Sequence, residues 1–123
     1  MSGDSEKYPG SALEDNLKKA LTELIILFLL SEKECYIGEL TAAISIRSHG
    51  VLSIVFPYGA IYRLQQSGYI MESQKRNAPD GRRRQYLQIT ASGHTRLLQL
   101  LKTYWHFSKG VADLLGESGG LDQ

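Results

Sequence analysis

The sequence has a single cysteine and almost no net charge. Cys35 is the only cysteine among 123 residues, so no disulfide can form within the chain, and a reducing, intracellular setting is favoured. A small packed side chain is a better interpretation of this thiol than a redox sensor. The formal net charge is +1, which by itself gives no support for binding to nucleic acid.

Long apolar runs and targeting signals are also missing. The longest apolar run, 24–30, is far shorter than the ~20 residues that span a bilayer. The start of the chain, MSGDSEKYPGSA, is polar and acidic, without the basic-then-apolar order of a signal peptide. The apolar fraction of 42% is enough to fill one modest core. We therefore expect a soluble, cytoplasmic protein with one compact domain.

Residue patterns that support catalysis are scarce. His49, His94 and His106 have no carboxylate at a spacing that suits a metal site. The sequence has no glycine-rich phosphate loop, nucleophile elbow or clustered carboxylate pair. We predict that the protein is not an enzyme and that it has no metal site and no cofactor.

Two helices are predicted in the first half of the chain. Residues 1–12 show no period and are interpreted as a flexible tail. Apolar residues then recur at helical spacing from 13 to 31, with Asp15 or Asn16 as the cap, and this helix should be central to the domain. A second helix is predicted over 36–46, with Leu40 and Ile44 on its inward face, followed by a polar turn to Gly50.

The start of a third helix is ambiguous. Ser53 suits an N-cap, but Pro57 discourages helical geometry in the residue before it, so the helix starts either near Ser53 or as late as Pro57. Gly68 is expected to end it. On a helix over 57–67, the inward residues are Pro57, Ala60, Ile61 and Leu64. The outward residues are Gly59, Tyr62, Arg63 and Gln66, with Tyr58 on the flank.

A basic β-hairpin is predicted to follow. The strands are 69–76 and 82–89, joined by the turn sequence NAPDG. Leu87 and Ile89 alternate onto one face, which leaves Tyr86, Arg84 and Arg82 on the other. Between residues 75 and 84 there are five basic residues and one acidic residue.

Thr90 is predicted to cap a last helix that runs to about residue 115. Its apolar stripe is too wide for one small domain to cover, so part of it should bury against a second copy of the chain. The residues assigned to dimerisation are Leu17, Leu21, Leu97, Leu101, Tyr104, Phe107, Val111 and Leu115. The aromatic residues Tyr104, Trp105 and Phe107 have two interpretations: dimer core, which is favoured, or a pocket between subunits in which one or more of them stacks on a flat apolar effector. Tyr104 and Trp105 are the residues assigned to the effector.

These elements predict a mostly helical α+β fold, a winged helix-turn-helix over 13–89, a dimerisation helix over 90–116 and a disordered tail over 117–123. A helix after a short polar turn has the geometry to enter a major groove, and a basic hairpin suits phosphates or a minor groove. Double-stranded DNA is therefore the predicted partner. The assigned DNA-binding residues are Ser53, Tyr58, Tyr62, Arg63, Gln66, Lys75, Arg76, Arg82, Arg83 and Arg84.

Several motifs in order resemble the PadR family of winged-helix transcriptional regulators, over about residues 17–115. They are LKKALTELIIL from Leu17, AIYRL from Ala60, SGYI from Ser67, RRRQY from Arg82 and ITASGH from Ile89. The resemblance implies a homodimer in which the last helix packs on the partner's first helix. It also implies that the dimer represses by binding a palindromic operator and is released by a small molecule.

The resemblance matches Tyr58 to the family's recognition-helix tyrosine and Arg82 to Arg84 to its wing arginines. Pro57 and Gly59 depart from the family pattern, and Tyr104 occupies the position of a pocket tryptophan found in multidrug-sensing relatives. The alternative hypothesis is a winged-helix protein-interaction module that does not bind DNA, favoured by the low net charge and by Pro57.

Overall fold

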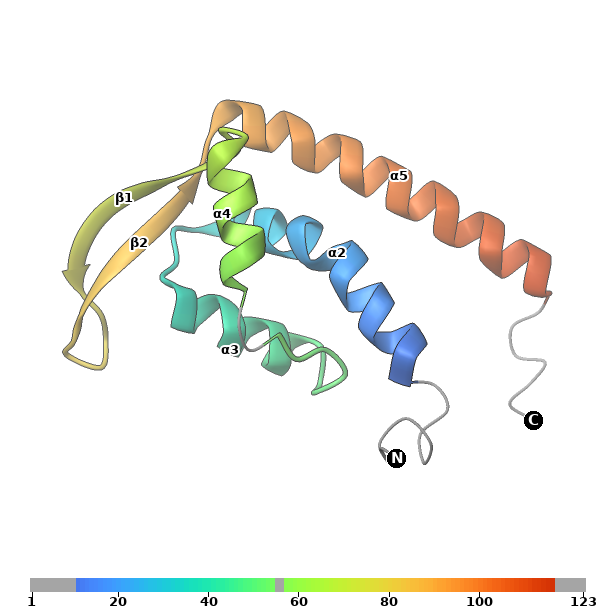
Figure 1. Ribbon diagram of the computed structural model, residues 1–123, viewed down its shortest axis with the longest axis horizontal. Helices are drawn as coiled ribbons and strands as arrows, with labels where there is room; N and C mark the ends of the chain where they lie inside the picture. The colour runs from blue at the N-terminus through green and yellow to red at the C-terminus, as the bar shows by residue number, and fades with distance from the viewer. Residues whose placement is uncertain (1–10, 55–56, 117–123) are drawn as a thin grey trace.

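The computed structural model describes residues 11–54 and 57–116, which form four helices and one antiparallel hairpin. In chain order these are α2 (Ser11–Glu32), α3 (Ile37–Arg47), α4 (Tyr58–Gln66), β1 (Ile70–Asn77), β2 (Arg83–Ile89) and α5 (Ala91–Leu115). The hairpin projects from one end of the helical body, and α5 runs along one side toward the other end (Figure 1). The predicted α+β winged-helix fold is confirmed.

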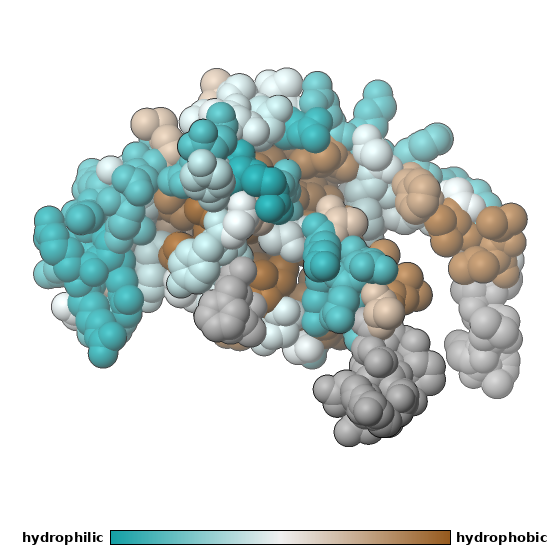
Figure 2. All heavy atoms as spheres, viewed as in Figure 1, coloured by the Kyte–Doolittle hydropathy of each residue, from teal (hydrophilic) through white to brown (hydrophobic). Residues whose placement is uncertain are grey.

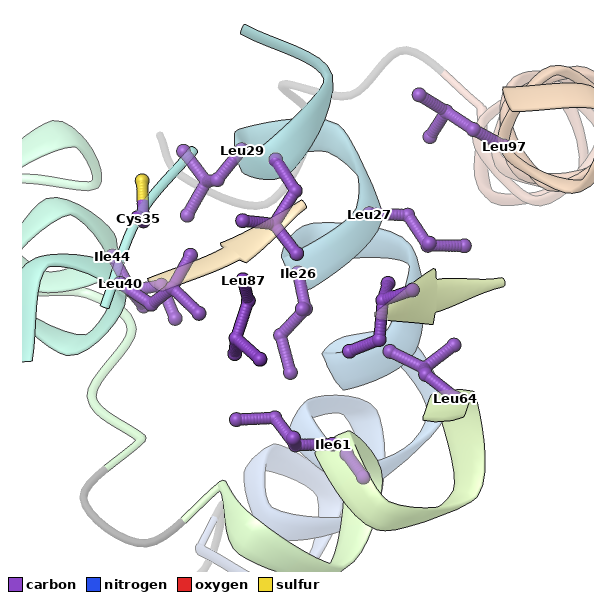
Figure 3. Packing of buried hydrophobic residues seen from close by; sticks show 13 residues of the cluster. Ile26, Leu27, Leu29, Cys35, Leu40, Ile44, Ile61, Leu64, Leu87 and Leu97 are labelled. Atoms are coloured by element: carbon purple, nitrogen blue, oxygen red, sulfur yellow. The ribbon is translucent and has the colours of Figure 1, made fainter. Parts of the chain in front are cut away.

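The core is built around α2. Ile26 and Leu27 are fully buried, and side chains from α3, α4, β2 and α5 pack around them (Figure 3). The prediction that this helix is central is therefore confirmed. Cys35 belongs to the same cluster, and its burial raises the pKa of the thiol, as expected for a packed side chain.

The first helix starts earlier than the sequence pattern predicted. α2 begins at Ser11 rather than Leu13, so Asp15 and Asn16 lie inside it and the proposed caps are wrong. Residues 12–14 are Ala, Leu and Glu, which are all strong helix formers. They therefore allow the helix to start at Ser11. The predicted tails lie mostly outside the described residues.

The recognition helix takes the later of the two predicted starts. Pro57 precedes the first residue of α4, and its carbonyl accepts a hydrogen bond from the Ile61 amide at 3.0 Å. Ser53 is not the cap, because Pro57 takes that position, where its missing N–H breaks no helical hydrogen bond. The predicted inward residues Pro57, Ala60, Ile61 and Leu64 are all buried. Gly68 ends the helix with a φ of +77°, as predicted.

The hairpin strands are shifted by about one residue from their predicted bounds, and Arg82 lies in the turn rather than in β2. The register changes between Glu72 and Lys75, where β1 has one more residue than β2. Cys35 and Leu87 exchange backbone hydrogen bonds of 3.2 and 2.8 Å. This bridge, which the sequence did not indicate, attaches the hairpin to the connection between α2 and α3.

The start of α5 is fixed against the end of α4. Thr90 caps α5 as predicted, with its Oγ1 accepting from the Gly93 amide at 3.0 Å. The same hydroxyl donates to the Gly68 carbonyl at 2.6 Å, and the Ser92 hydroxyl donates to that carbonyl at 3.0 Å. The direction of α5 is therefore coupled to the position of the recognition helix.

Candidate nucleic-acid interface

The exposed face of α4 carries side chains that can contact bases or phosphates. Tyr58 and Tyr62 are 57% and 61% exposed, and Gly59, Arg63 and Gln66 are exposed as well. The sequence predicted this outward face correctly. α3 precedes α4 across a loop, in the arrangement of a helix-turn-helix.

Arg63 is not independent of the rest of the domain. Its Nε lies 2.9 Å from Glu23 Oε2, so α2 holds the guanidinium beside the exposed face of α4. Both side chains are well exposed, so the pair contributes little to folding stability. A DNA phosphate would compete with Glu23 for the same cation.

The five basic residues of the wing, defined here as 70–89, divide into two groups. Hydrophilic residues cover this hairpin (Figure 2). The side chains of Lys75, Arg82 and Arg83 are exposed and form no ion pair within 11–54 and 57–116. They are the wing cations that remain available for phosphates.

Arg76 and Arg84 each have a carboxylate partner. Arg76 Nη1 lies 3.1 Å from Glu34 Oε1, and Arg84 Nη2 lies 2.9 Å from Asp80 Oδ2. The hydrogen bond from Arg84, and then that from the Arg82 amide, lowers the pKa of Asp80. Both arginines are half-buried, whereas the sequence treated all five cations alike.

A groove of about 620 Å³ lies beside the start of α4 and brings two further cations to this region. Lys18 and Lys19 of α2 line it together with Ser53, Gly59 and Arg63. Ser53, which was assigned to DNA binding, is exposed in the loop before α4. Sequence reasoning missed the two lysines, because they precede α4 by about forty positions and stand in an ordinary helical pattern.

The sequence profile of the transcriptional regulator PadR-like family matches residues 26–99, which is more than half of the chain. The chain belongs to the PadR family. The matched region includes the whole helix-turn-helix, the wing and the start of α5.

Solved structures agree with this assignment. A transcriptional regulator from Clostridium thermocellum shares 27% identity and a TM-score of 0.71, with 83% of this chain and 96% of that chain covered. A regulator from Streptococcus shares 26% identity and a TM-score of 0.69, covering 81% and 97%. A PadR-like regulator from Bacillus cereus, at 24% identity, has the same fold with a TM-score of 0.72 over 84% and 99%. No functionally curated protein matches the chain.

Two other kinds of feature are absent from residues 11–54 and 57–116 of this PadR-family chain. None of the helices in these parts has both the length and the apolar composition needed to cross a bilayer. Within the same parts, no three His, Cys, Asp or Glu side chains are grouped so that they could hold a metal ion.

An apolar groove of about 390 Å³ in this PadR-family chain lies between α2, α3 and α5. Tyr104 and Trp105, the two residues assigned to an effector, both line it. Their rings meet edge to face with 4.9 Å between centroids, and Trp105 remains 64% exposed. The sequence assigned the two aromatics together, but it did not predict that α2 and α3 would complete the groove.

The residues assigned to dimerisation differ in how far their side chains are exposed in one chain. Leu17, Phe107, Val111 and Leu115 are exposed, and Leu21, Leu101 and Tyr104 are half-buried. Leu97 is only 4% exposed because it already packs in the core of one chain, which leaves little of its side chain for a second copy. Hydrophobic residues collect at the far end of α5 (Figure 2).

Proposed function

We propose that the protein binds a palindromic DNA operator as a homodimer, represses transcription in the cytoplasm and is released by a small apolar molecule. The observation that carries the DNA-binding part is the combination of one exposed helix face with three cations on the adjacent wing that form no ion pair with any described residue. Tyr62 and Gln66 would face base edges in the major groove, while Arg82 and Arg83 would meet phosphates.

The exposed apolar surface of α5 supports the homodimer. At ~1.5 Å per residue, the 25 residues of α5 span roughly 37 Å. Only Gly93 and Leu97 are buried on it in one chain, whereas Phe107 and Leu115 are exposed. A second copy that covers this face would pair two recognition helices across a two-fold axis, as a palindrome requires.

The groove beside Tyr104 supports the effector. Its volume lies within the ~300–1,000 Å³ typical of small-molecule sites, and its lining is mostly apolar. A ligand in contact with α5 could change the angle between the two copies, because the start of α5 is fixed to the end of α4.

The proposal is tested with a duplex that the wild-type protein selects from a random-sequence DNA pool. Replacing Arg82 and Arg83 with Ala should weaken binding to all sequences alike. In a dimer this double variant removes up to four phosphate contacts, so the slope of log affinity against log salt should fall by up to about four.

The matched control removes two cations from α5, Lys102→Ala with Lys109→Ala. Both side chains are exposed on a helix that is proposed not to touch DNA, so the salt slope should stay at its wild-type value. Failure of the wild-type protein to bind any duplex at low salt would contradict the proposal and favour a protein-interaction module.

A further inference from the structure

Glu34, in the connection between α2 and α3, contacts two residues of β1. Its Oε1 accepts from Ser73 Oγ at 2.9 Å and from Arg76 Nη1 at 3.1 Å. Ser73 lies where the register of the hairpin shifts, between Glu72 and Lys75. Because an extra residue bends its strand at such a point, Glu34 holds β1 where the direction of the wing is set.

From Arg76 of β1, a chain of contacts runs to Tyr86 of β2 and then back to Tyr36, just before α3. The Arg76 guanidinium carbon lies 3.6 Å from the centre of the Tyr86 ring, and Tyr86 is only 4% exposed. The Tyr86 ring in turn meets Tyr36 edge to face, with 5.5 Å between centroids. Tyr36 is the N-cap residue of α3 and lies two positions after Glu34. We name Glu34, Arg76, Tyr86 and Tyr36 the wing clamp.

The charges in and beside the clamp are balanced locally. Arg76 and Arg84 are directly opposite each other in the β1–β2 ladder, where two like charges would destabilise the pairing. Glu34 compensates one and Asp80 the other. A phosphate that recruited Arg76 would have to break its ion pair with Glu34 and its stacking on Tyr86 together.

We propose that Glu34, through Arg76 and Tyr86, positions the wing for DNA, so that Lys75, Arg82 and Arg83 reach the phosphates while Arg76 does not. This inference rests on the proposed DNA-binding function. Glu34 is thus a positioning residue: an acidic side chain that favours the binding of a polyanion through the geometry of the wing.

The sign of one substitution separates this role from simple electrostatics. A carboxylate that only repelled DNA would, when removed, make binding tighter. We expect Glu34→Ala to weaken binding of the selected duplex about five- to tenfold, the scale of one lost hydrogen bond of ordinary net strength. Glu34→Gln also removes the charge but keeps an oxygen acceptor, so its affinity should lie between those of Glu34→Ala and the wild type.

Glu72→Ala is the matched control, because it removes a carboxylate from the same hairpin. The Glu72 side chain is exposed and makes no ion pair within the described ranges, so its loss should leave binding unchanged or slightly tighter. If the Glu34→Ala variant bound the duplex as tightly as the Glu72→Ala variant, the proposal would be overturned.

A charge-conserving pair gives a second test. Arg76→Lys keeps the charge but loses the planar group that stacks on Tyr86, and it should bind DNA more weakly. Arg96→Lys makes the same exchange on α5, outside the proposed DNA interface, and should bind like the wild type. Equal affinities for these two variants would show that Arg76 acts only as a charge, against the proposal.

Amide hydrogen exchange measures the clamp without DNA. In Glu34→Ala, the amides of β1 and β2 should exchange faster, while those of α4 should keep their protection. If no duplex is selected, the DNA-binding proposal fails, and this measurement still decides whether the clamp exists. Unchanged exchange in the hairpin would overturn it.

Discussion

Arg63 of α4 and Glu23 of α2 form an ion pair beside the exposed face of the recognition helix, with 2.9 Å between Nε and Oε2. The pair joins the helix that enters the predicted interface to the central helix of the core. It also places a carboxylate next to a cation that the sequence assigned to DNA. A phosphate that takes the Nε–H of Arg63 would displace Glu23, at a free-energy cost of up to about 1 kcal/mol for a pair this exposed.

We expect Glu23→Gln to increase DNA affinity by about two- to fivefold at low salt, because it releases Arg63 and removes a negative charge. The measurement is a binding titration with the selected duplex. Glu32→Gln removes the partner of Arg47 and makes the same change in net charge, so it controls for the overall field. Weaker binding by Glu23→Gln than by this control would mean that Glu23 positions Arg63.

Gly93 allows α5 to approach the end of α4. A Cβ at this position would lie 2.0 Å from the Tyr69 carbonyl oxygen and 2.7 Å from Ile89 Cγ1. Gly93→Ala should therefore lower the free energy of unfolding by about 1–3 kcal/mol or more, because backbone atoms must move. Urea denaturation measures this change.

Gly110→Ala is the control on the same helix. A Cβ at Gly110 meets no atom within 4 Å in the described parts of one chain, so alanine should stabilise α5 by up to about 1 kcal/mol. Equal effects of the two substitutions on unfolding would contradict the close contact at Gly93.

Trp105 is the single tryptophan of the chain and reports on the apolar face of α5. Because it is 64% exposed in one chain, dimer formation should bury it and shift its fluorescence to shorter wavelength. The emission should shift to longer wavelength on dilution, at the concentration where sedimentation detects dissociation. Phe107→Glu should keep the protein monomeric with the long-wavelength emission, while Lys109→Ala should dimerise normally. A dimer whose dissociation leaves the emission unchanged would exclude Trp105 from the interface.

Local sequence patterns predicted most of the secondary structure. The apolar repeat of α2, the glycine after α4 and the Thr90 cap of α5 each depend on contacts within a few residues, and these were predicted correctly. The start of α2 was predicted two residues too late, and the start of α4 was left open between two positions. A helix end is decided by small differences among neighbouring residues, several of which suit a cap.

The candidate site was predicted in composition but not in its internal organisation. The basic cluster at 75–84 and the outward face of α4 follow from residue types and helical or strand periods. The partners Glu23 and Glu34 do not, since each contacts a residue about forty positions away in the chain. The groove beside Tyr104 and the burial of Leu97 likewise depend on how α5 crosses α2.

The sequence by itself therefore determined that this is a winged-helix chain with a basic wing and a long apolar helix, because residue spacing specifies periods and turns. Only the tertiary structure decided which cations are available. Lys75, Arg82 and Arg83 are unpaired among the described residues, whereas Arg76, Arg84 and Arg63 have carboxylate partners. Ion pairing depends on distance in space, and the distance between Glu34 and Arg76 is set by the packing of the hairpin against the connection between α2 and α3.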